Sequence, residues 1–89
     1  ISAVKNNLTK IKTTVYPNPF DQTATLSFDF QQPTQLTIFS IDGKIVQQYQ
    51  STDNFYSIYR KQLRNGMYLY ELKKRSRNEI LYTGKLVIQ

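Results

Sequence analysis

The chain has 89 residues, enough for one small domain, and a formal net charge of +6 from twelve Lys and Arg against six Asp and Glu. It contains no Cys and no His. Without Cys there are no disulfides or thiolate nucleophiles, and without His the usual general base near neutral pH and the commonest metal ligand are missing. These absences argue against an enzyme.

The first residues are polar and carry no strong pattern. Their few apolar side chains fall at helical spacing, but the window is too short and too polar to hold a helix alone. We interpret residues 1–12 as a linker, with a candidate first strand from Ile11 to Tyr16. No apolar run is long enough to span a bilayer and no signal peptide is visible. Because the chain opens on Ile1, we expect a fragment of a longer precursor.

The hexad from Val15 to Phe20 contains Pro17 and Pro19. Proline fixes its own φ, has no N–H to donate and pushes the preceding residue toward extended geometry. We therefore predict a rigid extended segment that cannot continue a central strand. Tyr16 and Phe20 flank the prolines, and we expect both rings to pin the segment to a core.

Alternation of apolar and polar residues is cleanest from Thr23 to Phe30. This period predicts a strand packed on one side, which ends before Pro33. The apolar face consists of Ala24, Leu26, Phe28 and Phe30.

Two further strand-like runs, Leu36 to Ile41 and Lys44 to Tyr49, are separated by Asp42-Gly43. An Asp-Gly pair between two such runs is a strong hairpin signal, because both turn residues then adopt positive φ. We predict a tight hairpin at this point.

Three more strands are predicted nearer the end of the chain, over Phe55–Tyr59, Met67–Lys73 and Ile80–Ile88. The second of them places Tyr68, Tyr70 and Leu72 on one face. Gly84, inside the last strand, predicts a β-bulge.

A turn from Leu63 to Gly66 precedes Tyr68 in the pattern of a tyrosine corner, whose hydroxyl bonds back to nearby backbone. About seven short strands with turn signals roughly every ten residues predict an all-β fold. The pattern favours a seven-stranded, antiparallel, immunoglobulin-like β-sandwich, with a small barrel as the alternative.

The acidic residues form no pair singled out by spacing, as a glycosidase would require, so we interpret them as solvated charges. They are Asp21, Asp29, Asp42, Asp53, Glu71 and Glu79. No loop has the alternating Asp and Asn ligands of a calcium site, and the Ser and Thr hydroxyls have no His to activate them. We predict a chain that is not an enzyme and that holds no metal or other cofactor.

Basic residues gather over 60–64 and 73–77, which raises the question of nucleic-acid binding. Tyr68 and Tyr70 are assigned to the core face, so no nucleic-acid partner is predicted. The better alternative is a small immunoglobulin-like carbohydrate-binding or adhesion module. Its candidate platform consists of Tyr49, Tyr56, Tyr59 and Tyr82.

Several fragments follow one another in a recognisable order. They are Tyr16-Pro17-Asn18-Pro19-Phe20, a Thr-rich strand, Ile41-Asp42-Gly43-Lys44-Ile45-Val46, Leu63-Arg64-Asn65-Gly66-Met67-Tyr68 and Lys85-Leu86-Val87-Ile88. The set resembles the type A C-terminal sorting domain of proteins exported by the type IX secretion system of Bacteroidetes. The resemblance covers residues 14–89 and leaves residues 1–13 as a linker from an upstream cargo. Met67, where the family usually has a β-branched residue, and the basic turn 73–77 depart from the pattern.

The resemblance implies a seven-stranded sandwich without activity of its own that directs an upstream cargo across the outer membrane. The implied partners are an outer-membrane translocon, a shuttle and a sortase-like protease that usually removes the domain. The cargo would pass through the periplasm to the outer membrane, cell surface or medium, close to anionic lipopolysaccharide in some cases. The implied sorting-signal motif is Pro17, Asn18, Pro19, Gly43, Lys44, Gly66, Tyr68, Lys85, Leu86, Val87 and Ile88.

Two hypotheses follow for how such a signal is recognised. In the first, the prolines and glycines only shape the backbone, and the strand from Lys85 to Ile88 offers its edge to a carrier by strand addition. In the second, the basic turn from Lys73 to Arg77 helps the domain to approach an anionic cell surface.

Overall fold

The computed structural model describes residues 11–89, which form seven strands and no helix. The strands are β1 (Thr13–Tyr16), β2 (Thr23–Phe28), β3 (Thr34–Ser40), β4 (Ile45–Ser51), β5 (Phe55–Tyr59), β6 (Gly66–Lys74) and β7 (Glu79–Ile88). The all-β prediction is confirmed. The predicted linker lies outside the described residues up to position 10. None of the described residues forms a helix long and apolar enough to cross a membrane.

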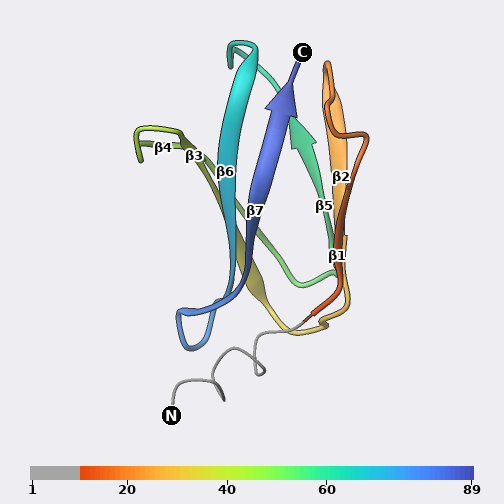
Figure 1. The fold of residues 1–89 in the computed structure, drawn as a ribbon. Helices are drawn as coiled ribbons and strands as arrows, with labels where there is room; N and C mark the ends of the chain where they lie inside the picture. Colours follow the sequence, from red (N-terminus) through yellow and green to blue (C-terminus); the bar gives the residue numbers. More distant parts are fainter. Residues whose placement is uncertain (1–10) are drawn as a thin grey trace.

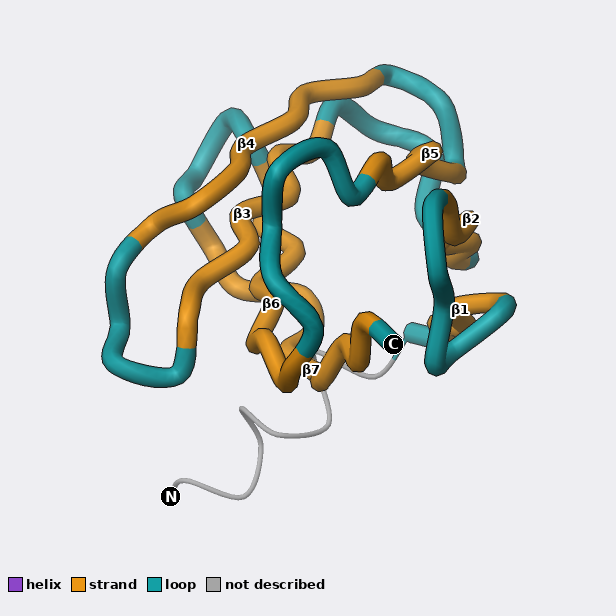
Figure 2. Tube along the Cα trace, turned by 90° about the horizontal axis from the view of Figure 1, so that it is seen from above, coloured by secondary structure: helices purple, strands orange, loops and turns teal. Residues whose placement is uncertain are grey.

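Two antiparallel sheets face each other across the core (Figures 1 and 2). One sheet has three strands in the order β1-β2-β5, and the other has four in the order β4-β3-β6-β7. Alternate residues of each strand point inward, so the two inner faces build one apolar core. β7 lies at the edge of the larger sheet.

Side-chain alternation in β2 and β6 sets the core, as predicted. Ala24, Leu26 and Phe28 are buried on β2, while the intervening Thr and Ser residues are exposed. On β6, Tyr68, Tyr70 and Leu72 are buried on the face that meets β2. This pattern is expected of a strand that has one solvent-exposed face and one buried face.

The double-proline hexad differs from its predicted form. Its first residues belong to β1, but residues 17–19 bend instead of staying extended, and Phe20 then forms a parallel bridge to Ile88. Phe20 is buried, whereas Tyr16 is 79 % exposed, so the prediction that both rings reach the core is wrong for Tyr16. The register explains this, because Tyr16 pairs with the outward-facing Thr25.

The hairpin predicted at Asp42-Gly43 is present between β3 and β4, but its loop is wider than expected. It spans residues 41–44, and of the two central residues only Gly43 has a positive φ, at 91°. The Gly43 N–H donates to the Ser40 carbonyl over 2.9 Å, and the Ser40 N–H donates to the Lys44 carbonyl over 2.8 Å. The loop is thus closed by its own backbone.

Gly84 does not form the predicted bulge. The register between β6 and β7 shifts at Leu72/Lys73 instead, opposite Leu81. Gly84 pairs with Tyr70, and a Cβ placed on it would lie 2.6 Å from the Tyr70 hydroxyl oxygen. The glycine therefore makes room for an aromatic ring that crosses the inner face of β7.

Candidate recognition surface at one end of the sandwich

One end of the sandwich gathers most of the motif residues. The pairings Tyr16 with Thr25, Ser40 with Tyr68 and Gly66 with Ile88 place the loops 17–22, 41–44 and 60–65 at the same end as the last residues of β7. We call this the motif end, and it is uppermost in Figure 1. The loops 29–33, 52–54 and 75–78 form the opposite end.

The double-proline segment is hydrogen-bonded to the outer edge of β7. The Asn18 side-chain amide donates to the Lys85 carbonyl over 3.1 Å, and its oxygen accepts from the Val87 N–H over 3.0 Å. The Phe20 N–H donates to the Val87 carbonyl over 2.9 Å, and the Gln89 N–H donates to the Phe20 carbonyl over 2.9 Å. These four bonds, which we call the clasp, join two sequence motifs that lie 67 or more residues apart.

The clasp changes how the last strand is available to a partner. Sequence reasoning gave Lys85–Ile88 a free edge, but the outward-facing groups of Lys85 and Val87 are already bonded. A carrier strand could add there only by displacing Asn18 and Phe20. The free edge that the hypothesis assumed is therefore occupied, and strand addition stays a prediction that requires the clasp to open.

The side chains of the last strand divide between core and surface. Leu86 and Ile88 are 1 % and 2 % exposed and fill the core, whereas Lys85 is exposed and Val87 is half-buried on the outer face. Leu86 pairs with Tyr68, and Ile88 pairs with Gly66. The fold thus brings Gly66, Tyr68 and the last motif together with the double-proline motif.

The remaining motif residues stand apart from the clasp. Gly43 and Lys44 lie at the motif end in the β3–β4 loop, and the sheet order places β3 and β6 between that loop and β7. A hydrogen bond from the Ser40 hydroxyl holds the pKa of the Asp42 carboxyl below its ordinary value. The loop therefore carries an ionised carboxylate beside Lys44 at neutral pH.

Tyr68 forms the tyrosine corner that its spacing predicts. Its hydroxyl donates to the Arg64 carbonyl over 2.8 Å, and the ring is buried. Gly66, between them, has a φ of 148°. The corner fixes the path of the loop that leads into β6.

Arg60 organises the motif end, and the sequence did not identify it beyond a count of basic residues. Its guanidinium donates to the Asp21 carboxylate over 3.2 Å, to the Leu63 carbonyl over 3.0 Å and to the Asn65 side chain. The Arg60 N–H donates to the Gln22 carbonyl over 2.9 Å. One planar side chain thus holds loop 17–22 against loop 60–65.

A family model described as a secretion system C-terminal sorting domain matches residues 14–89. The chain belongs to this family. The sorting domain is the signal that directs a protein into type IX secretion, and it acts as a cargo signal for that machinery. Its destination is the cell surface or the extracellular space. A comparison with curated proteins gave no match.

The basic turn of the sorting domain is largely occupied by internal contacts. Lys73 pairs with Glu71 and Lys74 pairs with Glu79, each over 3.5 Å. Arg75 donates to the carbonyls of two other strands. These contacts weaken the hypothesis that the whole turn meets an anionic surface.

The four tyrosines of the alternative carbohydrate platform do not form a row. Tyr56 is buried, with its hydroxyl 2.7 Å from the Thr34 hydroxyl, and Tyr49 is half-buried. Tyr59 and Tyr82 are exposed but lie on different sheets.

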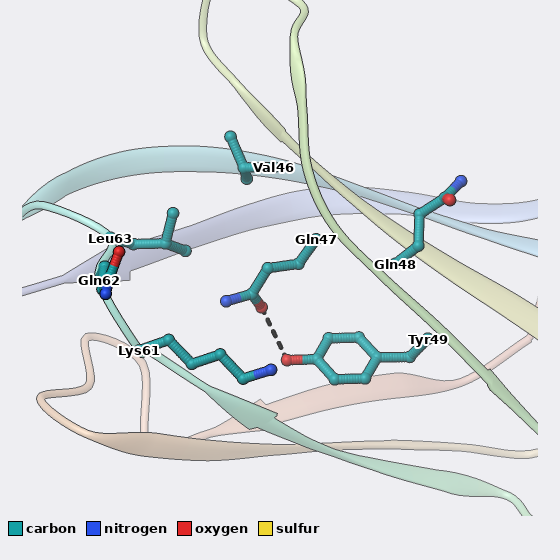
Figure 3. A pocket seen from close by; sticks show the side chains of 7 residues that line it. All are labelled: Val46, Gln47, Gln48, Tyr49, Lys61, Gln62 and Leu63. Atoms are coloured by element: carbon teal, nitrogen blue, oxygen red, sulfur yellow. Dashed lines mark hydrogen bonds between the residues drawn. The ribbon is translucent and has the colours of Figure 1, made fainter.

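A groove lies beside β4 and includes Tyr49 in its lining (Figure 3). It is lined by Val46, Gln47, Gln48, Tyr49, Lys61, Gln62 and Leu63. Tyr49 is the single aromatic side chain among them, and its hydroxyl donates to Gln47 over 2.7 Å. The groove therefore offers no stacked aromatic surface for a sugar.

Within residues 11–89, no three acidic side chains lie close enough together to hold a metal ion. Glu71 and Glu79 face lysines, and Asp21 faces Arg60. The predicted lack of catalysis and of cofactors stays a prediction.

Proposed function

We propose that the sorting domain is recognised as a folded shape, read at the motif end, and that it performs no chemistry. The clasp carries this proposal, because it uses the first motif to fix the last one at the end of the sandwich where the other motif residues also lie. Three of the six acidic residues, Asp21, Glu71 and Glu79, are engaged in ion pairs, which supports a non-enzymatic role.

The fold that we propose in detail is an immunoglobulin-like sandwich. Two facing antiparallel sheets and a tyrosine corner support this assignment. The chain enters β1 at the opposite end, where the Asp29 N–H donates to the Lys12 carbonyl over 3.1 Å. An upstream cargo would therefore attach away from the motif end and leave it accessible.

The route that we propose runs through the periplasm to an outer-membrane translocon, with a shuttle and a sortase-like protease as further partners. Removal of the domain by that protease then releases the cargo or joins it to anionic lipopolysaccharide. Membership of the sorting-domain family supports this route.

The test compares two substitutions that each remove a pair of hydrogen bonds to backbone groups. Asn18→Ala breaks two bonds of the clasp, and Arg75→Ala breaks the bonds to the Thr34 and Ser51 carbonyls at the opposite end. We expect a reporter fused ahead of the domain to be secreted several-fold less with Asn18→Ala and nearly normally with Arg75→Ala. Equal secretion of the two variants would contradict recognition at the motif end.

A further inference from the structure

An exposed apolar surface runs across the outer face of the four-stranded sheet at the motif end. Ile45, Phe39 and Leu69 are successive cross-strand neighbours on β4, β3 and β6. Met67 and Val87 form the adjacent pair on β6 and β7. We call these five residues the outer patch. Ile45 is 53 % exposed, Met67 47 % and Leu69 38 %.

The outer face of the other sheet shows that such continuity is not general. Tyr16, Phe55 and Tyr59 are also exposed there, but each pairs with a Thr or Ser of β2. Apolar residues scattered singly on a surface need no explanation, whereas a contiguous apolar surface indicates an interaction site.

A groove of about 370 Å³ borders the outer patch where β6 meets β7. Phe39 and Leu69 line it on one side, and Thr83 and Lys85 line it on the other. The hollow gives the patch a shape into which an apolar side chain of a partner can fit.

The rim of the outer patch carries Lys44 and Lys85, with the Asp42 carboxylate in the same loop as Lys44. Lys44 is adjacent to Ile45 in the chain, and Lys85 is the cross-strand neighbour of Leu69. Glu71 also lines the groove, but its charge is matched by Lys73 at 3.5 Å. A partner that covers the patch therefore needs an apolar centre and carboxylates at its rim.

We propose that the outer patch is a docking surface for a protein of the secretion machinery that presents an apolar face rimmed by carboxylates. This inference rests on the proposed function, since it names the face of the motif end that is read. The clasp contributes by holding β7, so that Lys85 and Val87 keep their places beside Leu69 and Met67.

The experiment uses the fused reporter with Met67→Ser and Leu69→Ser combined. Both side chains point away from the core, so the sheets keep their packing. We expect secretion to fall about tenfold, which corresponds to a loss of about 1.4 kcal/mol in the affinity for the partner. The matched control is Ile80→Ser, on the same outer face at the opposite end and 43 % exposed, which should leave secretion unchanged.

A second pair of variants keeps the test independent of folding losses. Lys44→Glu with Lys85→Glu leaves the apolar residues in place but reverses the rim charge, and it should also lower secretion. A melting temperature measured on each purified fusion identifies any variant that has lost its fold. If both variant pairs are secreted normally, the proposed docking surface is overturned. The proposed function is not affected by that result, provided that the unaltered domain still directs secretion of its reporter.

A second copy of the domain is the competing occupant. Sedimentation of the purified fusion at several concentrations distinguishes the two. We expect a monomer. If the fusion is instead a dimer, and if the combined Met67→Ser and Leu69→Ser substitutions abolish that dimer, the assignment to the secretion machinery is overturned.

Discussion

Asn18 shows how one side chain can take the place of a strand. Its amide group both donates to Lys85 and accepts from Val87, which is what a neighbouring backbone would offer to an edge strand. The residue type matters here, because Asp has no N–H to donate and Leu has neither group. The sequence marked Asn18 as part of a motif but did not indicate this partner, since nothing local links it to residues that follow 67 positions later.

Gly84 provides a second test at the scale of one residue. An added Cβ would lie 2.6 Å from the Tyr70 hydroxyl oxygen, inside van der Waals contact. We expect Gly84→Ala to lower the free energy of unfolding by about 1–3 kcal/mol, as overpacking does. Urea denaturation measures this loss. In a Tyr70→Leu background the same change should cost almost nothing, and an equal cost in both backgrounds would contradict the contact.

The ionisation of Tyr70 predicts how stability depends on alkaline pH. Burial, with a smaller contribution from Tyr82, raises the pKa of Tyr70 from 10.0 to about 12. Above pH 10 the unfolded chain releases this proton and the folded domain keeps it, so stability is complete below pH 10 and falls as the pH rises toward 12. The full loss should be on the order of 3 kcal/mol, from about 1.4 kcal/mol for each of the two pKa units.

Tyr70→Phe should reduce this pH dependence, as measured by thermal melting between pH 9 and 11. It should not abolish it, because burial also raises the pKa of Tyr49 and Tyr56. A slope that is unchanged in Tyr70→Phe would show that Tyr70 ionises alike in both states.

At the scale of elements, the strands could be predicted from the sequence, but the contacts between neighbouring strands could not. The alternation in Thr23–Phe28 and the Tyr68, Tyr70, Leu72 face came directly from residue spacing, because burial on one side of a strand imposes a period of two. The β-bulge predicted at Gly84 was misplaced, because the space beside Gly84 is filled by the Tyr70 side chain of the neighbouring strand. Such contacts depend on register, which single-strand patterns do not contain.

Loops 17–22 and 60–65, beside the clasp, are held together by the Arg60 side chain. Arg60→Lys keeps the charge but loses the planar fork that reaches Asp21, Leu63 and Asn65 together. We expect a loss of about 1–3 kcal/mol in the free energy of unfolding, measured by denaturant. Arg64 is exposed, and it contributes to the tyrosine corner only through its backbone carbonyl. Arg64→Lys should therefore leave the free energy of unfolding unchanged. An equal effect of both substitutions would contradict the bridging role.

At the scale of the whole molecule, the sandwich has two unlike ends. The motif end carries the clasp, the tyrosine corner and the outer patch, and the opposite end receives the chain at Lys12. Sequence order alone identified the family, because the motifs keep their succession along the chain. It could not show that motifs at the start and end of the domain touch, which only the folded topology reveals.

The most direct test of recognition at the motif end is secretion measured against stability for variants of both ends. The fused reporter is followed for Asn18→Ala and Arg60→Lys at the motif end and for Arg75→Ala at the opposite end, together with the melting temperature of each domain. We predict that the motif-end variants are secreted less than their melting temperatures alone account for, whereas Arg75→Ala is secreted as its melting temperature predicts. If secretion follows melting temperature alone, whichever end is changed, recognition at the motif end is contradicted.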